Sequence, residues 1–131
     1  MVPSNATTNG SSPSPDDAQR AAGRARQRAF MVAAVPAGED DHLAELAELL
    51  RTAGVATVGE VVQRRDRPHP NSYLGTGKLA ELKEQIAEAD ANLVACDDEL
   101  SPRQERNLEA ALGVPVIDRT AVILDIFAAH A

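Results

Sequence analysis

Four short apolar runs alternate with four helical patterns along this sequence, and the alternation limits the fold more than any other feature. Each apolar run is followed at once by proline or a charged residue, and each helical pattern repeats Leu, Ile or Ala every three to four residues. The predicted strands are residues 29–35, 55–63, 92–96 and 114–117, and the predicted helices are residues 40–53, 78–89, 101–112 and 121–131. Short buried strands that alternate with helices are typical of a parallel α/β sheet.

We therefore predict a small α/β domain with a four-stranded, mainly parallel sheet in the order 2-1-3-4 and helices on both faces. Connections between such strands are right-handed, and ligands bind at the carboxyl ends of the strands. Four charged residues follow the third and fourth predicted strands and are candidates for that crevice: Asp97, Asp98, Asp118 and Arg119.

The ends of two helices carry capping signals. Ser101 and Gln104 form an S-x-x-Q capping box, with Pro102 in the first turn. Gly113 is placed to end the same helix. Thr120 is the predicted cap of the last helix.

Composition bounds the organisation and the partners. Residues 1–26 are polar, rich in Ser and Pro, and aperiodic, which predicts a disordered leader before a domain of residues 27–131. The net charge of -7 disfavours bulk electrostatic binding to DNA, yet it allows a local basic patch. The single cysteine, Cys96, excludes an intrachain disulfide and fits a reducing cytoplasm. No apolar run is long enough for a membrane span, and no secretory signal is apparent, so we predict a cytoplasmic protein without a membrane partner.

Residues 64–78 (RRDRPHPNSYLGTGK), here called the basic loop, join the second strand to the second helix. Its prolines remove backbone donors, and Gly75 and Gly77 permit unusual backbone angles. Its candidates for contact with RNA or another anion are Arg64, Arg65, Arg67, Tyr73, Gly75, Gly77 and Lys78, with the tyrosine ring as a stacking surface. The alternative is that the arginines pair with Asp66, Glu60 or the acidic strand ends, and the sequence favours neither interpretation.

The Gly75–Lys78 turn has the appearance of a phosphate-binding loop at a helix start. It departs from the Walker pattern at two decisive positions, because Ser72 replaces a glycine and Leu79 replaces the magnesium-binding hydroxyl residue. The turn is therefore either an anion site or simply a glycine-assisted entry to the helix.

Other chemistry receives little support. Asp97, Asp98 and Glu99 are more typical of a solvated strand end than of a cation site. The three histidines have no zinc-ligand spacing, and Cys96 ends an apolar strand as a buried thiol would. We predict no catalytic residue and no metal site.

Two long segments resemble the N-terminal region of the HflX family, ribosome-associated GTPases: QRRDRPHPNSYLGTGKLAEL at residues 63–82 and DDELSPRQERNLEAALGVPVIDRTAVILDIFA at residues 97–128. The resemblance runs from about Arg28 to Phe127. It implies an α/β domain that precedes a GTPase module and helps to engage the large ribosomal subunit and its rRNA. A nucleotide role is also implied for this region of the family.

The sequence contains no Walker loop, no following D-x-x-G motif and no N-K-x-D motif. We therefore predict a non-enzymatic domain without a cofactor of its own, since GTP and magnesium belong to the full-length family. The first hypothesis is a ribosome-binding module. The second is a small-nucleotide binder for ATP or GTP with weak or no hydrolysis. The third is a truncated relic, whose last helix would expose Ile123, Leu124, Ile126 and Phe127 and self-associate.

Overall fold

The computed structural model describes residues 26–130, so the predicted leader lies outside the described residues except for Arg26. The strands are β1 (Arg28–Val35), β2 (Ala56–Arg64), β3 (Leu93–Cys96) and β4 (Val116–Asp118). The helices are α2 (Leu43–Thr52), α3 (Thr76–Glu88), α4 (Pro102–Leu112) and α5 (Arg119–His130). All strand pairs are parallel and the order is β2-β1-β3-β4, which confirms the predicted topology.

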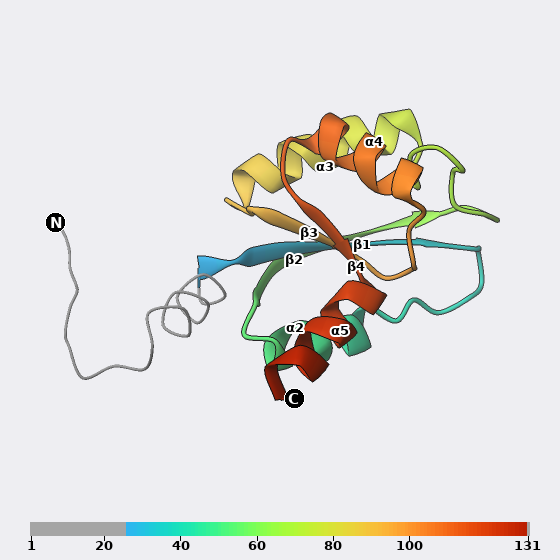
Figure 1. Ribbon diagram of the computed structural model, residues 1–131. Helices are drawn as coiled ribbons and strands as arrows, with labels where there is room; N and C mark the ends of the chain where they lie inside the picture. The colour runs from blue at the N-terminus through green and yellow to red at the C-terminus, as the bar shows by residue number, and fades with distance from the viewer. Residues whose placement is uncertain (1–25, 131) are drawn as a thin grey trace, which may run out of the picture.

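The sheet separates two helical layers, with α3 and α4 on one face and α2 and α5 on the other (Figure 1). β1 is buried throughout because it pairs with strands on both sides and is covered on both faces. Its even-numbered side chains from Phe30 to Ala34 join the α3–α4 core, and its odd-numbered ones from Ala29 to Val35 join the α2–α5 core. This alternation is the two-residue period of a strand.

Leucine and isoleucine fill both cores. On one face Leu79, Leu82 and Ile86 of α3 meet residues of α4, and on the other Leu46 and Leu50 of α2 are fully buried. Only two aromatic side chains, Phe30 and Tyr73, join these cores, both on the α3–α4 face. One of the few, Phe30, lies so close to Gly59 of β2 that a Cβ added there would be 2.4 Å from the ring.

Both ends of α4 agree with the sequence, since Gly113 ends the helix with a left-handed φ of 76°, whereas other helix ends differ. The capping box is confirmed, because the Gln104 N–H donates to Ser101 Oγ (3.1 Å) and the Ser101 N–H donates to Gln104 Oε1 (3.0 Å). Thr120 as the cap of the last helix is wrong. Asp118 Oδ1 accepts from the Ala121 N–H at 2.9 Å, so α5 begins at Arg119.

Two other helices begin at different residues from those predicted. α2 begins at Leu43 rather than at residue 40, because Asp41 Oδ1 accepts from the Leu43 N–H (3.0 Å) and organises the preceding turn. α3 begins at Thr76, two residues earlier than predicted, directly after Gly75. Among residues 26–130, no helix combines the length and apolar character that a membrane crossing requires.

Candidate functional site

Tyr73 anchors the basic loop to the sheet. Its side chain is 0% exposed, and its hydroxyl accepts from the Ala34 N–H at 3.0 Å and donates to Asp98 Oδ2 at 2.7 Å. The β1–β3 ladder ends at Val32 and Cys96, so the hydroxyl takes the place that a longer β3 would have filled beside Ala34. The proposed stacking role of Tyr73 is therefore wrong for this conformation, since the ring has no free face.

Burial and the hydrogen bond to Asp98 raise the pKa of Tyr73 well above its ordinary value. The backbone of Tyr73 has a positive φ of 67°, which is unusual for a bulky residue. Gly75 and Gly77, to which the sequence assigned unusual angles, have no positive φ. The strained position of the loop is thus the tyrosine, held there by the bonds of its hydroxyl.

A short closed turn precedes the anchor. The backbones of His69 and Tyr73 exchange two hydrogen bonds of 2.9 Å each, and the Asn71 N–H donates to His69 Nδ1 at 3.1 Å. Ser72 Oγ donates to the Leu74 carbonyl at 2.8 Å. These bonds give the loop one defined conformation.

The arginines of the basic loop bond to backbone carbonyls rather than to acids. Arg64 Nη1 donates to the Glu39 carbonyl at 2.6 Å, and Arg65 Nε donates to the Arg67 carbonyl at 3.1 Å. Arg67 is exposed. None of the three forms a salt bridge within residues 26–130, so the pairing with Asp66 or Glu60 that the sequence allowed is absent from this region.

The start of α3 has a positive electrostatic potential. No acidic residue lies in its first turn, and its cap residue, Gly75, has no side chain to offer. Arg65 Nη1 is only 3.0 Å from the place where a Cβ of Gly75 would be, so the guanidinium lies over the positive end of the helix. Lys78 is less available, because its ammonium pairs with Glu81 at 3.1 Å.

The strand-end candidates lie together, but they are engaged in internal bonds. Asp97 forms an ion pair with Arg119 and accepts from the His42 N–H at 3.2 Å. Asp118 Oδ2 accepts from the Leu100 N–H at 3.0 Å, and its other oxygen caps α5. These side chains join the loops at the carboxyl edge of the sheet to one another.

Two further candidates have structural surroundings. Cys96 is fully buried, and this burial, with Asp118 nearby, raises the pKa of its thiol far above the ordinary value. A thiol of this kind is a poor nucleophile. No group of three or more His, Cys, Asp or Glu side chains that could hold a metal ion occurs in residues 26–130.

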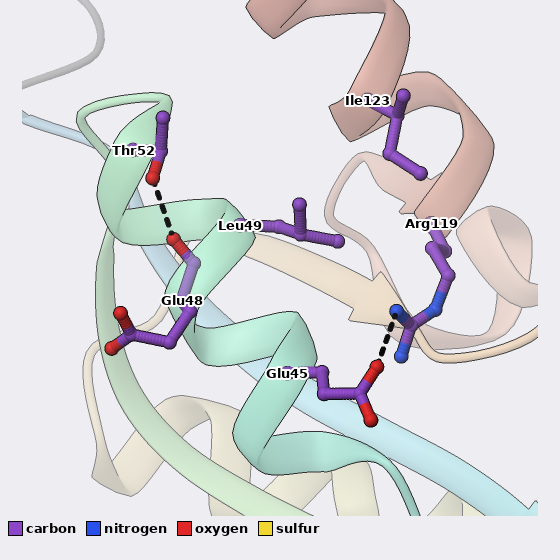
Figure 2. A pocket seen from close by; sticks show the side chains of 6 residues that line it. All are labelled: Glu45, Glu48, Leu49, Thr52, Arg119 and Ile123. Atoms are coloured by element: carbon purple, nitrogen blue, oxygen red, sulfur yellow. Dashed lines mark hydrogen bonds and ion pairs between the residues drawn. The ribbon is translucent and has the colours of Figure 1, made fainter.

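The sequence did not indicate a groove between α2 and α5 (Figure 2). It has a volume of about 380 Å³ and is lined by Glu45, Glu48, Leu49, Thr52, Arg119 and Ile123. Arg119 crosses one end of it and lies 3.8 Å from Glu45. Leu124 and Phe127, also on α5, are 62% and 69% exposed, as the sequence predicted for four apolar residues of this helix.

The family described as GTP-binding GTPase N-terminal matches residues 40–128. The chain belongs to this family. A protein named GTPase HflX from Lacrimispora saccharolytica is 53% identical over 108 residues, which are 80% of this chain and 26% of that protein. GTPase HflX from Escherichia coli (strain K12) is 43% identical over 91 residues, 70% of this chain and 21% of that protein. The HflX-type domain predicted from the sequence is confirmed, and the chain spans about a quarter of the length of these relatives.

A GTP-binding protein solved as a complex with GDP, SsGBP, has the same fold. It aligns with a TM-score of 0.62 and 21% identity over 80% of this chain and 30% of that protein. A GTP-binding protein from Sulfolobus solfataricus, also in complex with GDP, aligns with a TM-score of 0.57 at 21% identity. At these identities the alignments show the shared α/β architecture alone.

Proposed function

We propose that this HflX-type domain is a non-catalytic, cytoplasmic module that binds the large ribosomal subunit through the basic loop. The observation that carries the proposal is the state of Arg64, Arg65 and Arg67. In a chain with a net charge of -7, these three guanidinium groups have no carboxylate partner in the described region. Phosphate groups of rRNA are the complementary ligand for such arginines.

The rigidity of the loop supports the same proposal. Tyr73 fixes it to β1, and the paired backbones of His69 and Tyr73 close its turn. A loop that is ordered before binding loses less conformational entropy when it meets RNA. The local charge therefore acts at a defined place on an otherwise acidic domain.

Sedimentation of the tagged domain with purified 50S subunits tests this proposal. We expect the wild type to pellet with the subunits and an Arg64→Ala/Arg65→Ala/Arg67→Ala variant to be recovered at least several-fold less. An Arg51→Ala/Lys83→Ala variant removes exposed positive charge from α2 and α3 and should pellet like the wild type. Equal recovery of the loop variant and the wild type would contradict the role of the loop.

The salt dependence gives a second measurement. Each phosphate contact that is lost should reduce the slope of log affinity against log salt by roughly 0.7–0.9. The loop variant should therefore bind with a shallower salt dependence as well as more weakly. A slope unchanged from the wild type would argue against phosphate contacts by these arginines.

A second candidate function is binding of a small nucleotide, ATP or GTP, with weak or no hydrolysis. Arg65 over Gly75, together with the acid-free first turn of α3, favours an anionic ligand there. Calorimetry with ATP and GTP at millimolar concentration tests it, with Arg65→Ala and Lys78→Ala as variants. Heat that survives both substitutions would move the site elsewhere, and no heat with the wild type would end this candidate.

A further inference from the structure

The arginines from Arg28 onward fall into two groups. Arg28, Arg51 and Arg119 each pair with a carboxylate, for example Arg28 with Asp90 at 3.6 Å and Arg51 with Glu48 at 2.6 Å. The remaining arginines have no carboxylate partner within residues 26–130: Arg64, Arg65, Arg67, Arg103 and Arg106. The last two lie on α4, some forty residues away in sequence from the basic loop.

Hydrogen bonds join α4 directly to the basic loop. Gln104 Nε2 donates to the His69 carbonyl at 2.9 Å, and Asn107 Nδ2 donates to the Asn71 carbonyl at 2.8 Å. Arg103 Nη1 donates to Asn71 Oδ1 at 3.3 Å. These three bonds come from residues 103, 104 and 107, so the loop and α4 form one continuous surface.

Helical spacing places the two arginines of α4 on the exposed side of this surface. Arg103 and Arg106 are three residues apart, so their side chains are neighbours on the helix, and both are exposed. Asn107 beside them is also exposed. Glu105 lies about 200° around the helix from Arg103 and about 100° from Arg106, so it is not between the two arginines.

Two acids near this surface accept hydrogen bonds from neutral donors within the domain and form no salt bridge with its arginines. Asp98 accepts from the Tyr73 hydroxyl, and Glu109 Oε2 accepts from the Val116 N–H at 3.0 Å. The helix capping box uses Gln104 rather than an acid at its third position. Neither Arg103 nor Arg106 forms a salt bridge within residues 26–130, so both guanidinium groups can bind an external anion.

We propose that Arg67 of the loop and Arg103 and Arg106 of α4 form a single cationic face, here called the loop–α4 face, that binds an RNA phosphate backbone. This inference rests on the proposed ribosome-binding function and extends its RNA contact from the basic loop to the exposed arginines of α4. The basic loop alone would then be only half of the interface.

The chemistry of the loop–α4 face favours RNA over protein. Protein interfaces have an apolar centre with aromatic or aliphatic anchors, whereas this face offers guanidinium and amide groups. The large exposed apolar side chains of residues 26–130, Leu124 and Phe127, belong to α5 on the other side of the sheet. Guanidinium groups bond to phosphate oxygens in two-pronged geometry, and the Asn71 and Asn107 amides are suited to ribose hydroxyls.

The test compares binding of the domain to purified 50S subunits and to deproteinised large-subunit rRNA at several salt concentrations. We expect Arg103→Ala/Arg106→Ala to weaken binding to both by about tenfold or more and to reduce the log–log salt slope by roughly 1.4–1.8. Arg103→Lys/Arg106→Lys should restore most of the slope, because the charge is retained. Arg51→Ala/Lys83→Ala, which removes the same charge elsewhere, should bind like the wild type.

The outcomes separate this inference from the proposed function. If the wild type binds neither 50S subunits nor rRNA, both the proposed function and this inference are contradicted. If substitution of the loop arginines abolishes binding and substitution of Arg103 and Arg106 does not, only the loop–α4 face is overturned. Loss of 50S binding by the α4 variant, with rRNA binding and salt slope unchanged, would assign α4 to a protein contact and overturn the RNA partner. Thermal unfolding of each variant checks that the fold is intact.

Discussion

On the α3–α4 side of the sheet the core is closed by a loop, whereas on the α2–α5 side apolar surface is left open. Tyr73 is completely buried between the basic loop and β1, and Leu74 beside it is buried too. On the opposite side Phe127, also aromatic, is 69% exposed. The same domain thus uses one aromatic ring to order a polar loop and leaves another available at its surface.

The difference shows where the described residues are self-sufficient. The Tyr73 hydroxyl accepts from the backbone of β1 and donates to Asp98, so both its hydrogen-bonding roles are filled within the domain. On the other side, Leu124 and Phe127 of α5 are exposed, and a groove between α2 and α5 is lined in part by Leu49 and Ile123. An exposed apolar patch on a polar domain is typical of an interaction surface.

The largest expected difference between the two sides comes from matched aromatic truncations. Tyr73→Ala should lower the free energy of unfolding by about 3–5 kcal/mol, because it leaves a cavity and an unpaired Ala34 N–H. Phe127→Ala should lower it by less than about 0.5 kcal/mol, since its ring is mostly in solvent. Urea denaturation measures both. Similar losses of unfolding free energy would mean that the two aromatic residues contribute equally to stability, despite their different burial.

Packing density on the closed side can be tested at Gly59. Gly59→Ala should cost about 1–3 kcal/mol, because the new methyl group would overlap the Phe30 ring. Gly77→Ala is the matched control: a Cβ there meets nothing within 4 Å, and alanine favours the α3 helix, so stability should rise by about 0.5–1 kcal/mol. If urea denaturation gave a change in unfolding free energy of the same sign for both variants, the Phe30 ring would be able to move freely away from the new methyl group.

Alkaline pH should weaken the closed side selectively. The pKa of Tyr73 is raised in the folded protein, so above about pH 10 the unfolded chain ionises first. Stability from this group is complete below that pH and falls by about 1.4 kcal/mol per pH unit above it. Cys96 acts in the same direction from about pH 9. Tyr73→Phe should flatten the pH dependence above pH 10, and an unchanged profile would contradict the buried, neutral phenol.

The smallest effect on stability is expected from charge on the open side. Leu124→Glu/Phe127→Glu should leave the free energy of unfolding almost unchanged and should suppress the self-association predicted from this apolar surface. Sedimentation velocity over rising protein concentration measures the association. Ala80→Glu/Ala87→Glu on exposed positions of α3 adds equal charge as a control. A wild type that stays monomeric at high concentration would show that the patch does not bind itself.

The sequence was sufficient for the fold because its signals are local and agree with one another. The apolar runs and helical spacing give the strands, the helices and their order, and Ser101 with Gln104 specifies a helix start through bonds within four residues. Thr120 failed for an equally local reason, since Asp118 two residues before it is an equally good cap. Its carboxylate also reaches Leu100, which the sequence alone does not reveal.

The site was harder to predict because its bonds cross the fold. The candidates were chosen for charge, and the structure uses several of them as connectors: Asp97 holds Arg119, and Asp98 holds Tyr73. An aromatic residue inside a polar, proline-rich loop reads as a surface feature, and nothing near it in sequence indicates Ala34 as its partner. Arg103 and Arg106 were missed because arginine is common on exposed helices. Only the structure shows that these two have no carboxylate partner in the described region.

The hydrogen bond between Ala34 and the Tyr73 hydroxyl also fixes how many residues the chain has between β2 and Tyr73. The residues after β2 must bring Tyr73 to a position just beyond the end of β3. The turn between His69 and Tyr73 must at the same time be closed and packed against α4. A surface loop usually tolerates added or missing residues. This one does not have that freedom, because a one-residue insertion or deletion between Arg64 and Tyr73 would carry the phenol past its only matching N–H. We therefore expect length, more than composition, to be the invariant property of this segment.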